Sequence, residues 1–113
     1  MKRPIVIIES PFRAKGSKLP DLDYILYLRR CLRDSWAQGE HPLASHAYYP
    51  FFLDESKDSE RKEGIEAGYR MWPLAQYIVF YTDYGMSPGM ERALDRAVYL
   101  HRDVRTRAIG PNP

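Results

Sequence analysis

Cysteine is almost absent from this sequence, in which Cys31 is the single example. One cysteine cannot form a disulfide within the chain, and without a C-x-x-C pair or a cluster of cysteine and histidine there is no structural zinc motif. The histidines, His41, His46 and His101, lie far apart and lack the spacing of metal ligands. A histidine in a loop or at a strand end is more often a hydrogen-bonded structural residue. We therefore expect neither a metal nor another cofactor.

An excess of charge of one sign is also lacking. The 17 Lys and Arg residues against 15 Asp and Glu residues leave a net charge of +2, too little to indicate a surface for long nucleic acids. Long hydrophobic runs are missing near the start as well, because the apolar run over residues 5–8 is far shorter than a membrane span or the core of a signal peptide. These features, with the cysteine usage, predict a soluble, cytoplasmic protein that binds neither membranes nor long nucleic acids.

What the sequence does contain is enough for one hydrophobic core. With 113 residues, 44% of them hydrophobic, residues 1–113 are expected to form a single domain. Two continuous apolar runs, residues 4–10 and 76–83, are typical of strands buried on both faces. Residues 44–49 and 104–109 are weaker strand candidates, since the first is short and polar and the second alternates with arginines as an edge strand does.

Helical patterns lie between these strands. The first, over residues 21–38, has an apolar stripe made of Tyr24, Ile25, Leu28, Cys31, Leu32, Ser35 and Trp36. The second, over residues 59–72, is expected to start at a capping box at Ser59. It contains Gly64 and Gly68, which allow another backbone to approach closely.

The third helix has the clearest start signals, with Ser87 as an N-cap and Pro88 in the first turn. The elements then alternate between strand and helix from the start of the chain to its end. Right-handed crossovers between strands in that order give a parallel sheet covered by helices on both sides. We therefore predict an α/β protein with a small Rossmann-like three-layer fold and a four-stranded, mainly parallel sheet.

Ligands of open parallel sheets bind outside the carboxyl ends of the strands, where the strand order switches, so the loops after the first and third strands are candidate sites. The first loop, residues 9–18, supplies hydroxyl groups, a glycine and the cations Arg13, Lys15 and Lys18. This composition suits a phosphate or a carboxylate, although a merely solvated basic loop has the same composition. It is neither a Walker loop nor a G-x-G-x-x-G fingerprint, so ATPase and dinucleotide-binding functions have no motif here.

The other loop, residues 82–91, places Asp83 at the carboxyl end of a strand and Glu91 in the first turn of the next helix. We expect these two carboxylates to meet at the switch point of the sheet. Glu91 complements the helix dipole, which is a sufficient structural reason for its presence. A glutamate there is also able to act as a nucleophile on an anomeric carbon, because backbone dipoles keep it ionised and the loop glycine leaves room for a substrate. Asp83 would then orient a base or a hydroxyl group.

A resemblance to a known family is carried by residues 83–97, D-Y-G-M-S-P-G-M-E-R-A-L-D-R-A. This segment is similar to the nucleoside 2-deoxyribosyltransferase-like superfamily, which includes the deoxynucleoside 5′-monophosphate N-glycosidases. Residues 10–13 resemble the first loop of that family, and residues 52–68 are similar to its small uncharacterised phage and bacterial members. The resemblance spans nearly the whole chain and rests on short motifs.

The resemblance implies roles for individual residues. Glu91 matches the nucleophile and Asp83 the acid at the strand end. The residues that it implies for substrate binding are Ser10, Phe12, Arg13, Ser87, Gly89 and Met90. The chain departs from the family's pattern at Ala93, where its enzymes usually have glycine.

Three functions stay open. In the first, the protein cleaves the N-glycosidic bond of a nucleoside or nucleotide, or exchanges its base, through attack of Glu91 on the anomeric carbon and release by water or a second base. The alternative is a nucleotide-binding protein without turnover that sequesters or senses a nucleotide signal, and a purely structural interaction domain is a third. The protein is also expected to form a homodimer or a higher homo-oligomer, with some of its many aromatic residues buried between subunits or, alternatively, capping the pocket of a monomer. These aromatic residues are Tyr48, Tyr49, Phe51, Phe52, Tyr69 and Trp72.

Overall fold

The computed structural model describes residues 2–13 and 20–111 of the chain. It shows an α/β fold in which the strands form one parallel sheet in the order β2-β1-β3-β4. The strands are β1 (Ile5–Glu9), β2 (His41–Leu43), β3 (Tyr77–Tyr81) and β4 (Val104–Arg107). The helices are α1 (Leu22–Ala37), α2 (Ser45–Tyr48), α3 (Asp58–Tyr69) and α4 (Pro88–Tyr99), with short 3-10 turns at η1 (Tyr49–Phe51) and η2 (Trp72–Leu74). No helix in the described part of the chain has the length and hydrophobicity to cross a membrane.

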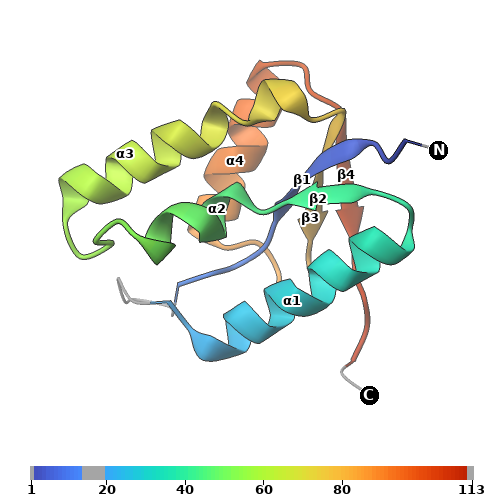
Figure 1. Ribbon diagram of the computed structural model, residues 1–113, viewed down its shortest axis with the longest axis horizontal. Coiled ribbons are helices and arrows are strands. Elements are labelled where there is room, and N and C mark those ends of the chain that lie inside the picture. Colours follow the sequence, from blue (N-terminus) through green and yellow to red (C-terminus); the bar gives the residue numbers. More distant parts are fainter. Residues whose placement is uncertain (1, 14–19, 112–113) are drawn as a thin grey trace.

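Helices cover both faces of the sheet (Figure 1). On one face, Val6 and Ile8 of β1 pack with Leu28 and Cys31 of α1. On the other face, Ile7 packs with the buried stripe of α4 and with η2. Because alternate residues of a strand point to opposite faces, β1 is buried on both sides. The small Rossmann-like three-layer fold with a parallel sheet, predicted from the sequence, is confirmed.

The starts of α1 and α4 follow from local sequence. Asp21 caps α1, and its carboxylate accepts a hydrogen bond from the backbone N–H of Asp23 at 2.8 Å. Ser87 caps α4 in the same way, accepting from the backbone N–H of Met90 at 3.2 Å, while Pro88 occupies the first turn. The predicted N-cap at Ser87 is therefore confirmed.

Only part of the apolar stripe predicted for α1 is buried in the structure. Its buried residues are Tyr27, Leu28, Cys31 and Ser35. Ile25 and Trp36, which were expected on this face, are 40% and 52% exposed. The ring of Trp36 instead lies under the guanidinium group of Arg3, whose central carbon is 3.5 Å from the ring centroid.

The strand predicted over residues 44–49 is wrong. The strand in this region is β2, which pairs with β1 from His41 to Leu43, and the chain then forms α2. Ala44 and Ala47 pack against the core on the α1 side of the sheet, contacts that a helical turn supplies and a continued edge strand does not.

The capping box predicted at Ser59 is also wrong. α3 begins one residue earlier, at Asp58, and no side chain caps it through a hydrogen bond. Acidic residues in the first turn, Asp58 and Glu60, complement the positive end of the helix dipole in its place. The helix ends at Tyr69, and Trp72, which was expected at its end, begins η2.

Two glycines let α3 lie close to the segment that contains α2 and η1, beside which it runs in Figure 1. A Cβ atom at Gly64 would be 3.1 Å from the Cβ of Tyr49, tighter than ordinary van der Waals contact. One at Gly68 would be 3.4 Å from the Oγ of Ser45. The close approach predicted for these glycines is confirmed, and it fixes the position of α3 over the end of the sheet.

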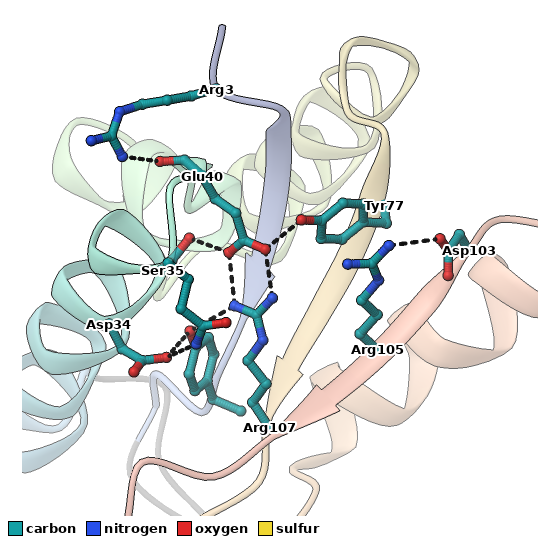
Figure 2. A network of polar contacts seen from close by, with 10 residues as sticks. Arg3, Asp34, Ser35, Glu40, Tyr77, Asp103, Arg105 and Arg107 are labelled. Atoms are coloured by element: carbon teal, nitrogen blue, oxygen red, sulfur yellow. Dashed lines mark hydrogen bonds and ion pairs between the residues drawn. The ribbon is translucent and has the colours of Figure 1, made fainter. Parts of the chain in front are cut away.

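A buried polar network centred on Glu40, the residue before β2, joins α1, β3 and β4 (Figure 2). The carboxylate of Glu40 accepts hydrogen bonds from the Ser35 hydroxyl at 2.8 Å, from the Tyr77 hydroxyl and from both terminal nitrogens of Arg107. Burial opposes the charge, but hydrogen bonds from Arg107, Tyr77 and Ser35 lower the pKa of Glu40 to about 2. The network thereby holds the edge strand β4 to the end of α1.

Candidate ligand-binding site

A cavity opens where the strand order of the sheet switches. β1 lies between β2 and β3, so the chain leaves β1 toward one side and returns to β3 on the other. The carboxyl ends of strands at such a point form the usual ligand crevice of open α/β sheets. The cavity has a volume of about 540 Å³, within the range of roughly 300–1,000 Å³ for small-molecule sites. Its walls come from the loop after β1, from α2 and α3, and from the loop that leads into α4.

Three arginines from separate elements line this cavity: Arg13 after β1, Arg61 on α3 and Arg92 on α4. Burial, together with the charges of Arg13 and Arg92, lowers the pKa of Arg61. The Nε atom of Arg13 is buried and has no hydrogen-bond partner within the described residues. Glu55 contributes a carboxylate to the same wall and offsets part of this positive charge. The wall as a whole is cationic.

The arginine wall continues to the N-terminus of α4. Gly89 lines the cavity there, and a Cβ atom added to it would be 3.7 Å from a terminal nitrogen of Arg92 and 4.0 Å from the Ser87 hydroxyl. The guanidinium group of Arg92 and the hydroxyl of Ser87 therefore both lie close to Gly89, at the start of the helix. Such a combination suits an anion with several oxygen atoms, such as a phosphate.

Aromatic rings form much of the remaining wall. They belong to Phe12, Tyr24, Tyr49, Tyr69 and Tyr84. Tyr84 packs edge-on against Tyr24, with 5.2 Å between the ring centroids, and Phe12 packs edge-on against His46 at 5.9 Å. Rings fixed in this way offer a flat ligand a surface to pack on.

Three polar residues of the cavity are buried: Glu9, Ser10 and Ser45 are 6%, 3% and 4% exposed. The Oγ atom of Ser10 lies 3.0 Å from Nε2 of His46, and burial lowers the pKa of this histidine to about 4, so its ring is neutral at pH 7. Burial raises the pKa of Glu9 to about 8, so its carboxyl group is mostly protonated at pH 7. We call Glu9, Ser10 and His46 the inner wall.

The structure brings together the residues predicted to bind substrate. Lining the cavity are Ser10, Phe12, Arg13, Ser87, Gly89 and Met90. Met90 is also part of the hydrophobic core that lies between the sheet and α4. Two cations of the first loop, Lys15 and Lys18, lie outside the described residues.

The two carboxylates predicted to be catalytic do not meet at the cavity, and that expected geometry is wrong. Glu91 is exposed and does not line the cavity, because α4 turns Met90 and Ala93 inward. The Asp83 carboxylate is also outside the lining and binds the hydroxyl of Tyr27 and backbone N–H groups after β4. The catalytic role of Glu91 stays a prediction that rests on the resemblance.

Comparison with known proteins gives one match. The family model described as domain of unknown function (DUF7768) matches residues 4–107. The chain belongs to the DUF7768 family. The matched part of this DUF7768 domain includes every described strand and all the residues that line the cavity. No curated protein and no solved structure matches the chain.

Several residues of the cavity in this DUF7768 domain were missed at the level of sequence. Arg61 and Arg92 lie on helices among many other charged residues, and nothing local distinguishes them. His46 lay within a segment expected to be a strand and was interpreted as structural. Glu9 had a usable signal, because it directly follows the continuous apolar run of a strand buried on both faces. A carboxyl group in that position is buried with the strand.

Proposed function

We propose that this domain binds a small phosphorylated ligand of the nucleotide class in the cavity at the carboxyl ends of β1 and β3. The proposal rests chiefly on the arginine wall, in which Arg13, Arg61 and Arg92 face one cavity and the buried Nε of Arg13 has no partner within the described residues. Like charges held close together repel one another, and the lowered pKa of Arg61, due to burial and to the neighbouring guanidinium charges, reflects that cost. A bound anion removes it.

A phosphate group fits this wall chemically. Guanidinium groups bind two phosphate oxygens at once through paired N–H donors, which gives both affinity and orientation. The first turn of α4, with Gly89 at the cavity surface, adds the positive end of the helix dipole.

The rest of the cavity supports a ligand larger than a free phosphate. Its volume of about 540 Å³ and its five aromatic rings leave room and surface for a flat ring system beside the anion. A heterocyclic base joined through a sugar to a phosphate has both parts, which is why the nucleotide class is preferred.

Cleavage of an N-glycosidic bond is the leading function that the sequence and the resemblance suggest. The loop from Ser87 to Gly89 lies at the cavity, as such a site needs, but Glu91 is exposed and outside it. We therefore favour binding without turnover through Glu91, as expected of a protein that sequesters or senses a nucleotide.

Calorimetric titration with adenosine 5′-monophosphate and with adenosine tests the proposal. Loss of one charge-assisted phosphate contact, in Arg13→Ala or Arg61→Ala, should weaken nucleotide binding by about 1.5–3 kcal/mol and nucleoside binding much less. Arg70→Ala is the matched control, because Arg70 is an exposed residue at the end of α3 and does not line the cavity. Absence of binding for every nucleotide in a panel of the four common bases would overturn the proposal. Equal losses for nucleotide and nucleoside would assign the arginines a packing role.

A further inference from the structure

Glu9 is a feature of the cavity that a phosphate site leaves unexplained. It ends β1, where alternation places its side chain on the same face of the sheet as Ile7, toward α4. The residue is 6% exposed, lines the cavity and forms no hydrogen bond or ion pair with another described residue. Among the described residues, the fully buried polar atoms that lack a partner do not include the carboxyl oxygens of Glu9, so this group opens to the cavity that it lines. A largely buried polar group with no protein partner gains free energy when a ligand supplies one.

We propose that Glu9 determines ligand specificity. Its neutral carboxyl group donates a hydrogen bond to an acceptor atom on the uncharged part of the ligand, which is the ring or the sugar. The arginine wall binds the phosphate of the same ligand. This inference rests on the proposed function and deepens it. It assigns the arginine wall to the phosphate of a nucleotide and the inner wall to the uncharged part of the same ligand.

The two protonation states of the Glu9 carboxyl group differ in the hydrogen bonds that they can form. A neutral carboxyl group offers one O–H donor and a carbonyl acceptor, whereas a carboxylate only accepts and brings a negative charge into a site for an anion. Burial is the cause that raises the pKa of Glu9 to about 8, and the arginines do not offset it. At pH 7 the donor form therefore predominates, and it is lost as the pH rises toward 9.

The other groups around the cavity do not titrate between these pH values in a way that imitates Glu9. Burial lowers the pKa of His46, on α2, to about 4. Burial and the nearby Glu9 raise the pKa of Tyr69, at the end of α3, above its ordinary value of 10. The guanidinium groups of the loop after β1, of α3 and of α4 stay charged throughout this range. Glu55 is the remaining carboxyl group on the cavity wall, and a variant of Glu9 alone separates the two.

The experiment is calorimetric titration of the full chain with the 5′-monophosphates of adenosine, guanosine, cytidine and uridine at pH 7 and pH 9. For the best of these probes, wild-type affinity should fall about tenfold between the two pH values, as the neutral fraction of Glu9 falls. Glu9→Gln keeps a donor and an acceptor of similar shape but cannot ionise, so it should retain the affinity at pH 7 within about twofold and lose the pH dependence. Glu9→Leu removes the donor and should bind about tenfold more weakly at pH 7.

Glu63→Gln is the matched control, since Glu63 is an exposed residue of α3 that does not line the cavity, and it should behave as wild type at both pH values. Equal wild-type affinity at pH 7 and pH 9, or a Glu9→Gln variant as weak as Glu9→Leu, would overturn the inference while the proposed function stands. Failure of all four probes to bind would overturn both.

A ¹³C NMR titration of the Glu9 carboxyl group in the free protein needs no ligand and tests the neutral donor directly. A midpoint near 8 is expected, and a midpoint near the ordinary 4.5 would overturn the inference even if nucleotides bind.

Discussion

The hydroxyl of Tyr27 donates a 2.5 Å hydrogen bond to the Oδ1 atom of Asp83, and the backbone N–H of Asp83 donates to the same hydroxyl at 3.1 Å. The carboxylate also accepts hydrogen bonds from the backbone N–H groups of Ile109 and Gly110. Partial burial opposes its charge, but these hydrogen bonds lower the pKa of Asp83. Asp83, which follows β3, thus joins α1 to the segment after β4 and does not line the cavity.

Replacing Asp83 should therefore affect stability and leave ligand binding intact. Asp83→Ala is expected to lower the free energy of unfolding by about 1 kcal/mol, a modest value because the carboxylate is exposed and screened by solvent. Urea unfolding followed by circular dichroism measures this, and Tyr27→Phe should give a loss of similar size. If Asp83→Ala instead lost nucleotide binding at unchanged stability, Asp83 would be a residue of the ligand site, as the sequence suggested.

Glu91→Gln separates binding from cleavage. Because the side chain is exposed and outside the cavity, nucleotide affinity should stay within about twofold of wild type. The lost complement to the helix dipole should reduce stability by at most about 1 kcal/mol. Chromatography of nucleotide incubated with the protein detects a released base. A base released by wild type and not by Glu91→Gln, with Asp95→Asn as a control on the same helix, would establish the nucleophile that the resemblance implies.

Glu40→Gln should be the most destabilising of these changes. The side chains of Glu40 and Arg107 are 4% and 16% exposed, so removal of one charge leaves the other buried without its partner. A loss of about 3 kcal/mol is expected, measured by urea unfolding at pH 7. A loss below 0.5 kcal/mol, the size of an ordinary surface change, would contradict the assignment of this network as a buried ion pair.

The same network predicts a dependence on acid. The pKa of Glu40 is lowered from its ordinary 4.5 to about 2, so the stability that it contributes is complete above pH 4.5 and is lost as the pH falls through 2. The difference in unfolding free energy between wild type and Glu40→Gln should therefore shrink as the pH falls from 5 to 2. A difference that stays constant over this range would show that the charge of Glu40 is not what stabilises the fold.

The structure reduces the set of aromatic residues that are available for the predicted contact between subunits. Trp72 is 1% exposed and belongs to the core of the subunit itself, so it is not available for a contact between subunits. Phe51 and Phe52 are 91% and 58% exposed, beside Tyr48 at 57%. If these rings form the subunit contact, light scattering should give a multiple of the monomer mass for wild type and the monomer mass for a folded Phe51→Glu variant. A monomeric wild type would contradict the prediction.

The two central strands could be predicted from the sequence, because a short, continuous apolar run is typical of a strand buried on both faces. Residues of β1 and β3 are buried on both faces, and this pattern does not depend on distant partners for its recognition. β2 could not be found in this way. Its residues, His41 to Leu43, carry no strand pattern, and pairing with β1 determines their conformation.

The position of the cavity was predictable, but only part of its chemistry was. Sheet topology indicates the loops after β1 and β3, and residues such as Ser10 and Ser87 follow from it. Which charged residue of a polar helix faces inward depends on how the helix packs, and for α3 this is decided by Gly64 and Gly68 against the α2 segment. Arg61 could therefore not be selected from its neighbours in the sequence.

The strand order has a consequence for how the chain is made. Val6 of β1 lies opposite Pro42 of β2 and Tyr77 of β3, so its two neighbours come from distant parts of the sequence. During synthesis β1 leaves the ribosome first and gains β2 early, but its other edge has no native partner until β3 emerges. Pairings of such long sequence separation form slowly, and an unpaired apolar strand is prone to aggregate. The edge of β1 that pairs with β3 is therefore open to non-native pairing until β3 has emerged.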